Sequence, residues 1–271
     1  MRLGVVGVAG SGPAGFAAAD RAARGAWLAA ALPGAPSVVA DVVVAHAAGS
    51  PSPHGTVLIA GTGAVAASVR DDEVARRADG HGWLLGDTGS GVWLGVQAAR
   101  ATLEALDGRG RTTGLTVDVL TELGALGSGG PLPADVGDRT TLAQRVIGIV
   151  DLMRPAELGR LAPLVSRAAE AGDPVAARIS AAAVDGLMET LGAVHEGPAA
   201  GGVGVGAAVV LAGSVLLQPG PVRSGVRLGV LDRWGVEPHD AGDGAGGAAT
   251  MALRRAGHPV TAGVHARLTA R

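Results

Sequence analysis

The chain has 271 residues and a formal net charge of −2, and 48% of its residues are hydrophobic, enough for a substantial core. It contains no cysteine, which excludes disulfides, thiolate nucleophiles and cysteine-ligated zinc or iron–sulfur clusters. All 22 basic residues are arginine, so a Walker A loop, which needs a G-K-[ST] sequence, is excluded as well. No basic stripe accompanies stacking aromatic residues, and we therefore expect no nucleic-acid partner.

Two apolar stretches resemble export or membrane signals. Met1–Gly12 contains a short apolar run, and Gly197–Val222 contains no charged residue. Glycines interrupt both stretches, and the continuous apolar run Ala207–Ala212 has the length of a strand. We interpret both as buried strands and expect a cytoplasmic protein with no membrane partner.

The first part of the chain alternates strand and helix. Strand Leu3–Ala9 is followed by a glycine-rich turn at Gly10–Gly15, a helix at Phe16–Leu32 and a second strand, Val38–Ala45, which contains Asp41. This order predicts a parallel α/β sheet with ligands at the carboxyl ends of its strands. The turn also matches G-x-G-x-x-G, so a Rossmann-type NAD(P)-binding oxidoreductase is one alternative.

A polar loop at Gly49–Gly55 indicates a domain boundary, and helical periodicity dominates from Thr140 to Val194. The other expected elements are strands Thr56–Ala60, Ala64–Val69 and Arg76–Asp79, helix Val92–Leu106 capped by Ser90 or Thr88, a helix starting at Asp173-Pro174, strand Ala207–Ala212, helix Arg223–Trp234, and a last helix from Gly244 to Arg255. No periodicity is visible from His258 onward.

Four glycine-rich turns each follow an apolar strand, at Gly10–Gly15, Gly61–Gly63, Gly86–Gly91 and Gly213-Ser214. Glycine lets main-chain N–H groups approach an anion closely, and successive N–H groups form a nest that suits a phosphate. The glycines of any one of these segments can also serve only to form a turn, without binding a ligand. The repetition after strands favours a protein that handles a nucleotide.

The segment Gly55–Gly95 carries a more specific pattern, T-V-L-I-A-G-T-G followed by G-H-G-W-L-L-G-D-T-G-S-G. It resembles the BadF/BadG/BcrA/BcrD-type ATPase family, which includes the N-acetylglucosamine kinases. The resemblance continues more loosely through Val209–Val215 and Gly242–Leu253. It implies an α/β protein with the two-domain actin-like ATPase (ribonuclease H-like) fold. It also implies ATP-dependent phosphotransfer to an amino sugar, with ATP and Mg²⁺ as cofactors.

The resemblance also implies roles for single residues. Asp41 matches the acid that accepts the proton of the attacking sugar hydroxyl, and phosphoryl transfer needs little more than such a base and charge stabilisation. Asp87 matches the carboxylate that holds sugar hydroxyls, with His81 and Gly82 in the same sugar-binding segment. The implied ATP-binding residues are Gly61, Thr62 and Gly63 of the second phosphate-binding hairpin, Gly213 and Ser214 beside the adenosine, and Gly246 and Gly247 near the base. No residue is implied as a metal ligand.

Two features depart from the family pattern. Where the sugar kinases carry G-W-G, this chain has Gly80-His81-Gly82, with the tryptophan at Trp83. The family opens with a strand and a D-G-G-G-T hairpin, a motif that this sequence does not contain. We therefore expect Met1 to correspond to the family's fourth strand, with an incomplete first domain. A chain of this extent is then expected to be inactive, or to be a non-catalytic sugar- or nucleotide-binding relative.

The expected domains are residues 1–54, the remnant of a first α/β domain on the sugar side that the C-terminal helix joins; residues 55–257, a second α/β domain with a helical insertion at 92–196; and a tail at 258–271. A small-molecule sugar is the expected partner, and a homodimer is left open. The family's activators of dehydratases and reductases are excluded because they hold an iron–sulfur cluster through cysteines.

Three further groups of residues have no expected role in the site. The histidines His46, His54, His81, His239 and His258 lack paired metal-ligand spacing and are interpreted as loop or surface residues. The tryptophans Trp27, Trp83, Trp93 and Trp234 are interpreted as core. The acids Asp71, Asp72 and Glu73 are interpreted as a solvated hairpin tip.

Overall fold

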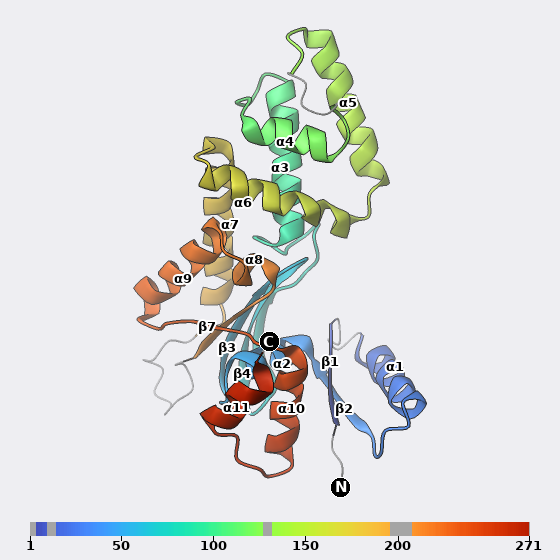
Figure 1. Cartoon of the computed structure of the whole chain (residues 1–271), viewed down its shortest axis with the longest axis vertical. Helices are drawn as coiled ribbons and strands as arrows, with labels where there is room; N and C mark the ends of the chain where they lie inside the picture. The colour runs from blue at the N-terminus through green and yellow to red at the C-terminus, as the bar shows by residue number, and fades with distance from the viewer. Residues whose placement is uncertain (1–3, 10–14, 127–131, 196–207, 271) are drawn as a thin grey trace.

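The computed structural model of the chain describes residues 4–9, 15–126, 132–195 and 208–270. It contains a two-stranded sheet, β1-β2, and a five-stranded sheet with the order β5-β4-β3-β6-β7 (Figure 1). In the smaller sheet, β1 (Gly4–Val8) pairs in parallel with β2 (Pro36–Ala40), and α1 (Phe16–Ala29) connects them. The β-α-β order and the parallel pairing predicted from the sequence are confirmed.

The second strand is shorter than predicted. It ends at Ala40, and α2 (Asp41–Gly49) begins directly, so the prediction of a strand through Ala45 was wrong. Helix α2 packs against both sheets, and most of its side chains are buried. A helix that is apolar all round shows no amphipathic period, so a short one cannot be told from a buried strand by its pattern.

The larger sheet begins with an antiparallel meander of β3 (Gly55–Ala60), β4 (Ala64–Arg70) and β5 (Glu73–Asp79). Strands β6 (Val209–Ala212) and β7 (His239–Asp240) extend the sheet in parallel from the other side of β3. The predicted strands at β3, β4 and β6 are confirmed, and β5 is longer than its predicted tail.

Alternate residues of this sheet face two separate cores, because side chains alternate across a strand. Leu58 and Leu211 belong to the larger core, together with residues of helices on that side. Val57 and Val210 belong to a smaller core shared with α2 and α10 (Gly244–Arg255). Burial on both faces explains why β3 and β6 are apolar throughout.

Helices cover the larger-core face and extend well beyond the sheet (Figure 1). They are α3 (Gly91–Leu106), α4 (Gly114–Glu122), α5 (Val136–Leu152), the short 3-10 helix η1 (Pro155–Leu161), α6 (Ala162–Glu170), α7 (Pro174–Gly192), α8 (Ser214–Leu217) and α9 (Pro221–Trp234). Two predicted caps are confirmed: the Ser90 hydroxyl accepts from the Trp93 N–H at 3.1 Å, and the Asp173 carboxylate accepts from the Val175 N–H at 2.9 Å.

The opposite face of the sheet carries α2 and α10, with α11 (Ala262–Thr269) packed beside α10. Helix α11 was not predicted. Its buried residues are the polar His265 and Thr269, so it has no apolar stripe to give a helical signal. His265 Nε2 lies 2.9 Å from the Ala47 carbonyl oxygen and ties α11 to α2.

Within the described ranges, no helix combines the length and the hydropathy needed to cross a bilayer. Two sequence features lie outside those ranges. They are residues 10–14 of the first glycine-rich turn, which carry most of the Rossmann-like match, and residues 196–207 of the uncharged stretch.

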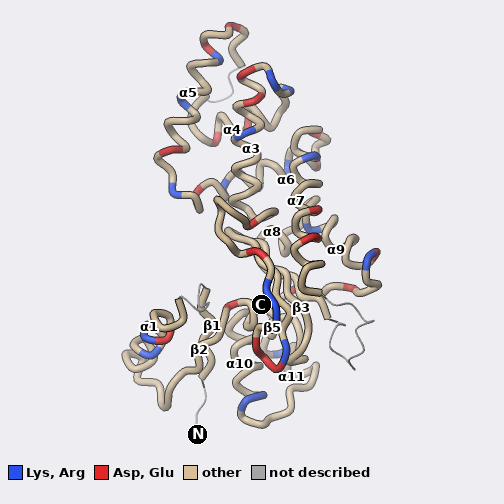
Figure 2. Tube along the Cα trace, turned by 180° about the vertical axis from the view of Figure 1, so that it is seen from behind, with Lys and Arg blue, Asp and Glu red and all other residues tan. Residues whose placement is uncertain are grey.

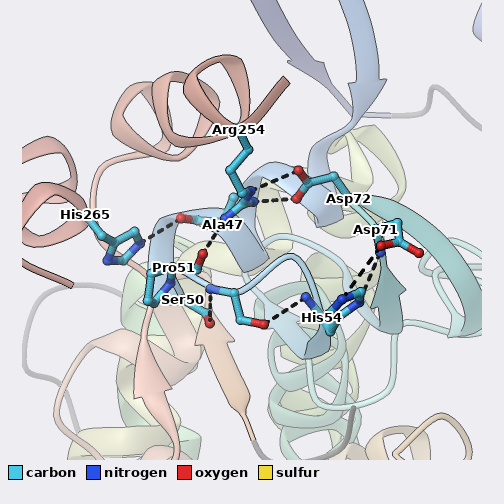
Figure 3. A network of polar contacts seen from close by, with 9 residues as sticks. Ala47, Ser50, Pro51, His54, Asp71, Asp72, Arg254 and His265 are labelled. Carbon is cyan, nitrogen blue, oxygen red and sulfur yellow. Dashed lines mark hydrogen bonds and ion pairs between the residues drawn. The ribbon is translucent and has the colours of Figure 1, made fainter. Parts of the chain in front are cut away.

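Three interpretations of single residues were wrong. His46 was assigned to a loop or the surface but is fully buried on α2. Asp72 was assigned to a solvated tip but is 7% exposed, because Arg254 of α10 covers it (Figure 3). Trp83 was assigned to the core but is 46% exposed. The burial of His46 and Asp72 depends on contacts between distant segments, which local pattern does not reveal.

Candidate active site

Three of the four glycine turns meet at the carboxyl ends of β3 and β6. The Gly91 N–H donates to the Gly61 carbonyl at 2.7 Å, and a Cβ on Gly61 would lie 3.7 Å from the Cα of Gly213. Gly213 itself has a φ of +86°, and a Cβ there would overlap with the Ala60 carbonyl oxygen. Only glycine therefore fits where the β6–α8 turn crosses the end of β3.

A cavity of about 440 Å³, which we call the β3–α6 cavity, opens beside these turns. Gly61, Thr62 and Ser214 line it, together with residues of α6 and of the segment after α8. No hydrogen bond within the described residues uses the N–H groups of Thr62 and Gly63. A cavity of this size suits a small molecule, and the N–H groups of Thr62, which lines it, and of the adjacent Gly63 suit the phosphates of a nucleotide.

A second cavity of about 520 Å³, which we call the Asp41 cavity, lies beside it. Asp41 lines it from the start of α2, together with residues of β1 and of the start of α10. Gly213 lines the Asp41 cavity, and the next residue, Ser214, lines the β3–α6 cavity. The two cavities therefore adjoin at this turn.

Asp41 is half-buried at the point where β2 ends. Burial raises the pKa of its carboxyl group, while a hydrogen bond from the Val42 N–H at 3.0 Å and the positive charge of Arg77 oppose that rise. A raised pKa makes the carboxylate a stronger base, which suits a group that accepts a proton.

Arg77 connects Asp41 with the loop that follows β5. It lies on β5, the edge strand on which Figure 2 shows a stretch of positive charge. Its guanidinium donates to the Gly80 carbonyl at 3.3 Å, while its charge acts on Asp41. The charge of Arg77 thus reaches Asp41 from β5, the strand that leads into the β5–α3 loop.

Asp87 lies at the end of that loop with its carboxylate against the Gly61–Gly63 turn. A Cβ on Gly63 would be 2.7 Å from Asp87 Oδ2, so the absence of a side chain at Gly63 leaves room for the Asp87 carboxylate. Asp87 is 8% exposed, and its carboxylate accepts no hydrogen bond from another described residue. It is not among the residues that line either of the two cavities, so the structure brings Asp87 to the Gly61–Gly63 turn rather than to Asp41.

His81 and Gly82, the other two residues predicted to bind sugar, are exposed in the same loop. Gly82 has a φ of +86°, and its carbonyl accepts from the Gly86 N–H at 2.8 Å, which closes the loop into a tight turn. The role of both residues in sugar binding stays a prediction.

Gly246 and Gly247 lie away from the β3–α6 cavity. A Cβ on Gly246 would overlap with the Leu268 carbonyl oxygen of α11, and a Cβ on Gly247 would be 2.5 Å from the Val44 carbonyl oxygen of α2. Close helix packing accounts for both glycines, and their contact with a nucleotide base stays a prediction.

The fold and the converging turns define a protein of the actin-like ATPase, or ribonuclease H-like, fold class. A family model described as the BadF/BadG/BcrA/BcrD ATPase family matches residues 1–252. The chain belongs to this family, as its motifs predicted.

Solved structures with the same fold include two proteins assigned provisionally as N-acetylglucosamine kinases. The protein from Chromobacterium violaceum is 26% identical, with a TM-score of 0.64 over 92% of this chain and 75% of that one. The protein from Porphyromonas gingivalis is 18% identical, with a TM-score of 0.62 over 94% of this chain and 78% of that one, and it shows the fold alone.

Two curated relatives match a shorter part of the chain. An N-acetylmuramic acid/N-acetylglucosamine kinase of Clostridium acetobutylicum is 36% identical over 83 residues, which is 31% of this chain and 27% of the relative. An N-acetyl-D-glucosamine kinase of Dictyostelium discoideum is 38% identical over 88 residues, 32% of this chain and 28% of the relative. The matches thus span a little over a quarter of the length of each relative.

Sequence reasoning missed two residues beside the site, Arg77 and Asp79. Both appeared only as the tail of a strand. The spacing of Asp79 before the G-D turn could have drawn attention to it, because aspartate often accepts hydrogen bonds from main-chain N–H groups further along a turn.

Proposed function

We propose that this protein transfers the γ-phosphoryl group of ATP to a hydroxyl of an amino sugar of the N-acetylglucosamine type. The observation that carries the proposal is the meeting of the Gly61–Gly63, Gly86–Gly91 and Gly213-Ser214 turns beside two adjoining cavities, one of which contains Asp41. A cytoplasmic location, where ATP is available as the donor, is part of the same proposal.

The donor would bind in the β3–α6 cavity. The free N–H groups of Thr62 and Gly63, and the hydroxyl of Thr62, would hold its phosphates, and Ser214 would lie beside the nucleoside. Described residues contain no group of three acids or histidines that could cage a metal ion. A Mg²⁺ ion would arrive on the phosphates and keep several of its waters, and it would neutralise charge on the transferring group.

Asp41 would act as the base. It takes the proton of the attacking hydroxyl while the sugar oxygen forms a bond to the γ-phosphorus and the bond from that phosphorus to the bridging oxygen of ADP breaks. The raised pKa of Asp41 suits this role. Asp87 would hold sugar hydroxyls, because a buried carboxylate with no internal partner gains most from a donor that a ligand supplies.

The type of sugar rests on the relatives. Both curated relatives are named as kinases of N-acetylglucosamine, and one also of N-acetylmuramic acid. The Gly55–Gly95 segment, which resembles the family, contains the loop with Asp87, His81 and Gly82, in which this chain carries G-H-G instead of G-W-G. The acceptor is therefore proposed as a class, with N-acetylglucosamine as the first member to test.

The test is a reaction of the full chain with ATP, Mg²⁺ and N-acetylglucosamine, followed by phosphorus NMR for a sugar phosphate, alongside calorimetry for each ligand. We expect binding of both ligands, and a sugar phosphate product would support transfer and overturn the inactivity predicted from the sequence. The Asp41→Asn variant should lose about 10²–10⁴-fold in turnover while ATP binds as before, as for the loss of a general base.

A matched control is Asp20→Asn, because Asp20 is also a half-buried aspartate of the first 54 residues but is paired with Arg24 on α1. It should leave turnover unchanged. Binding of both ligands without product would support a non-catalytic binding protein instead, and an Asp41→Asn variant with full turnover would remove Asp41 as the base.

A further inference from the structure

The loop between β5 and α3 is held by a residue that the family motif does not point to, Asp79. It is the last residue of β5, and its φ of +60° places it in the left-handed region, which aspartate adopts more readily than most residues other than glycine. Asp87, at the other end of the loop, has a φ of +56°. Two aspartates with a left-handed backbone thus bracket one loop, and a short polar side chain can restrain such a backbone by hydrogen-bonding locally.

The carboxylate of Asp79 supplies that restraint. Its Oδ1 accepts from the N–H of Asp87 at 2.8 Å, and its Oδ2 accepts from the N–H of Thr88 at 3.1 Å. Both are hydrogen bonds to an ionised acceptor, which are shorter and stronger than neutral ones. The Asp79 side chain therefore holds two consecutive N–H groups, those of Asp87 and Thr88.

Two glycines show how closely this arrangement is packed. A Cβ on Gly86 would overlap with Asp79 Oδ1, so only glycine admits the Asp79 carboxylate at that point. A Cβ on Gly63 would be 2.7 Å from Asp87 Oδ2, so a second glycine admits the Asp87 carboxylate. Asp79 is thus linked through Asp87 to the turn that is proposed to bind phosphate.

We propose that Asp79 is the positioning residue of the acceptor site: it holds the backbone at residues 87 and 88 so that the buried Asp87 carboxylate faces the sugar hydroxyls. The inference rests on the proposed function for the identity of the ligand. The clamp itself, from the Asp79 carboxylate to two N–H groups, can be tested without any ligand.

Two variants separate the clamp from the fold. Asp79→Gly removes the carboxylate but suits the left-handed backbone, so it relieves strain instead of adding it. Asp79→Asn keeps one acceptor oxygen, which can still bind the Asp87 N–H, and should restore part of the effect. The matched control is Asp71→Gly, because Asp71 also has a left-handed φ, +52°, at the other end of β5, with a side chain that is 88% exposed.

In the Asp79→Gly variant we expect the KM for N-acetylglucosamine to rise by about tenfold or more, since one hydrogen bond to a charged group corresponds to roughly that change. The KM for ATP should rise by less than the KM for the sugar, because Asp79 holds no N–H group of the Gly61–Gly63 turn and reaches that turn only through Asp87. Amide exchange at residues 87 and 88, resolved by NMR, should accelerate. Asp79→Asn should lie between wild type and Asp79→Gly, and Asp71→Gly should match wild type.

Three results would overturn the inference. The first is faster amide exchange with an unchanged KM for sugar, which would make Asp79 purely structural. The second is an equal rise of both KM values, which would indicate general damage. The third is unchanged exchange at residues 87 and 88. If the unaltered chain forms no sugar phosphate, the proposed transfer fails, and the affinity for sugar is then measured by calorimetry in place of KM. Equal sugar affinities of the wild type and the Asp79→Gly variant would then overturn the positioning role on their own.

Discussion

Arg254 and Asp72 form a buried ion pair although they are 182 positions apart in the chain (Figure 3). The Arg254 Nε–H donates to Asp72 Oδ2 at 3.0 Å, a second guanidinium N–H donates to Asp72 Oδ1, and a third donates to the Pro51 carbonyl at 2.7 Å. Helix α10 is thereby attached to the β4–β5 turn and to the loop that leads into β3. The start of the same helix lines the Asp41 cavity, so this ion pair fixes one wall of the site from its far end.

The first prediction concerns this ion pair. Asp72→Asn leaves the buried Arg254 guanidinium without its counter-charge, and loss of one partner of a buried pair costs about 3–5 kcal/mol of unfolding free energy. Urea unfolding should show that loss. The neighbouring Asp71→Asn is the control, because its side chain is 88% exposed and exposed pairs contribute about 0–1 kcal/mol. Equal effects of the two substitutions would contradict the structural role of the pair.

The second prediction concerns His46, which is buried on α2 with both ring nitrogens unpartnered among the described residues. Burial, with a smaller effect from the charge of Arg254, lowers its pKa from 6.5 to about 4. Between these two values the unfolded chain takes up a proton that the folded chain does not. The contribution of neutral, buried His46 to the free energy of unfolding is therefore fully present above about pH 6.5 and is lost as the pH drops toward 4.

From this histidine, urea unfolding should give roughly 2 kcal/mol less stability at pH 5 than at pH 7. His46→Leu should remove most of that difference, and it loses no hydrogen bond because the ring makes none within the described residues. His239→Gln, at an exposed histidine, is the control and should leave the difference in place. A His46→Leu protein with the full pH dependence would assign it to other groups.

The third prediction tests the close approach at Gly213. Gly213→Ala puts an L residue at a φ of +86° and also drives its Cβ into the Ala60 carbonyl, which should displace Ser214 from the β3–α6 cavity. Gly108→Ala is the matched control, because its φ is +74° but no atom lies within 4 Å of the added Cβ. Both should lose about 1–2 kcal/mol to backbone strain.

Only Gly213→Ala should lower the affinity for ATP as well, by roughly tenfold or more, the equivalent of one lost hydrogen bond to a charged group. Calorimetry with ATP and thermal unfolding of both variants measure the two effects. Equal ATP affinity in the two variants would place the nucleotide elsewhere.

The strands and turns around the candidate site could be predicted because their signals are local. A strand, a glycine turn and a returning strand are contiguous at β3–β4, and the two strands pair as an antiparallel hairpin with Leu58 opposite Ala66. The G-D turn and its Ser90 cap are equally local. Such signals depend on backbone geometry over a few residues, which sequence records directly.

The parts that sequence did not reveal depend on packing between distant segments. Asp72 was expected in solvent because nothing near it in sequence supplies Arg254. Helix α2 was expected as a strand because both of its faces are buried. The glycines at 246 and 247 match a family motif, but their close contacts are with α11 and α2, and three-dimensional placement alone could show that.

The last prediction concerns the pH dependence of transfer and rests on Asp41 as the base. Asp41 must be ionised to accept a proton, so the rate falls as the pH drops through its pKa. Burial raises that pKa, and the charge of Arg77 lowers it. Arg77→Gln removes the charge, so the pKa rises further and the acidic limb of kcat/KM moves to higher pH. Arg76→Gln is the control, because consecutive side chains of β5 point to opposite faces of the sheet. Its acidic limb should coincide with that of wild type, and a limb in the Arg77→Gln profile that stays in place or moves to lower pH would show that Asp41 is not the group that titrates.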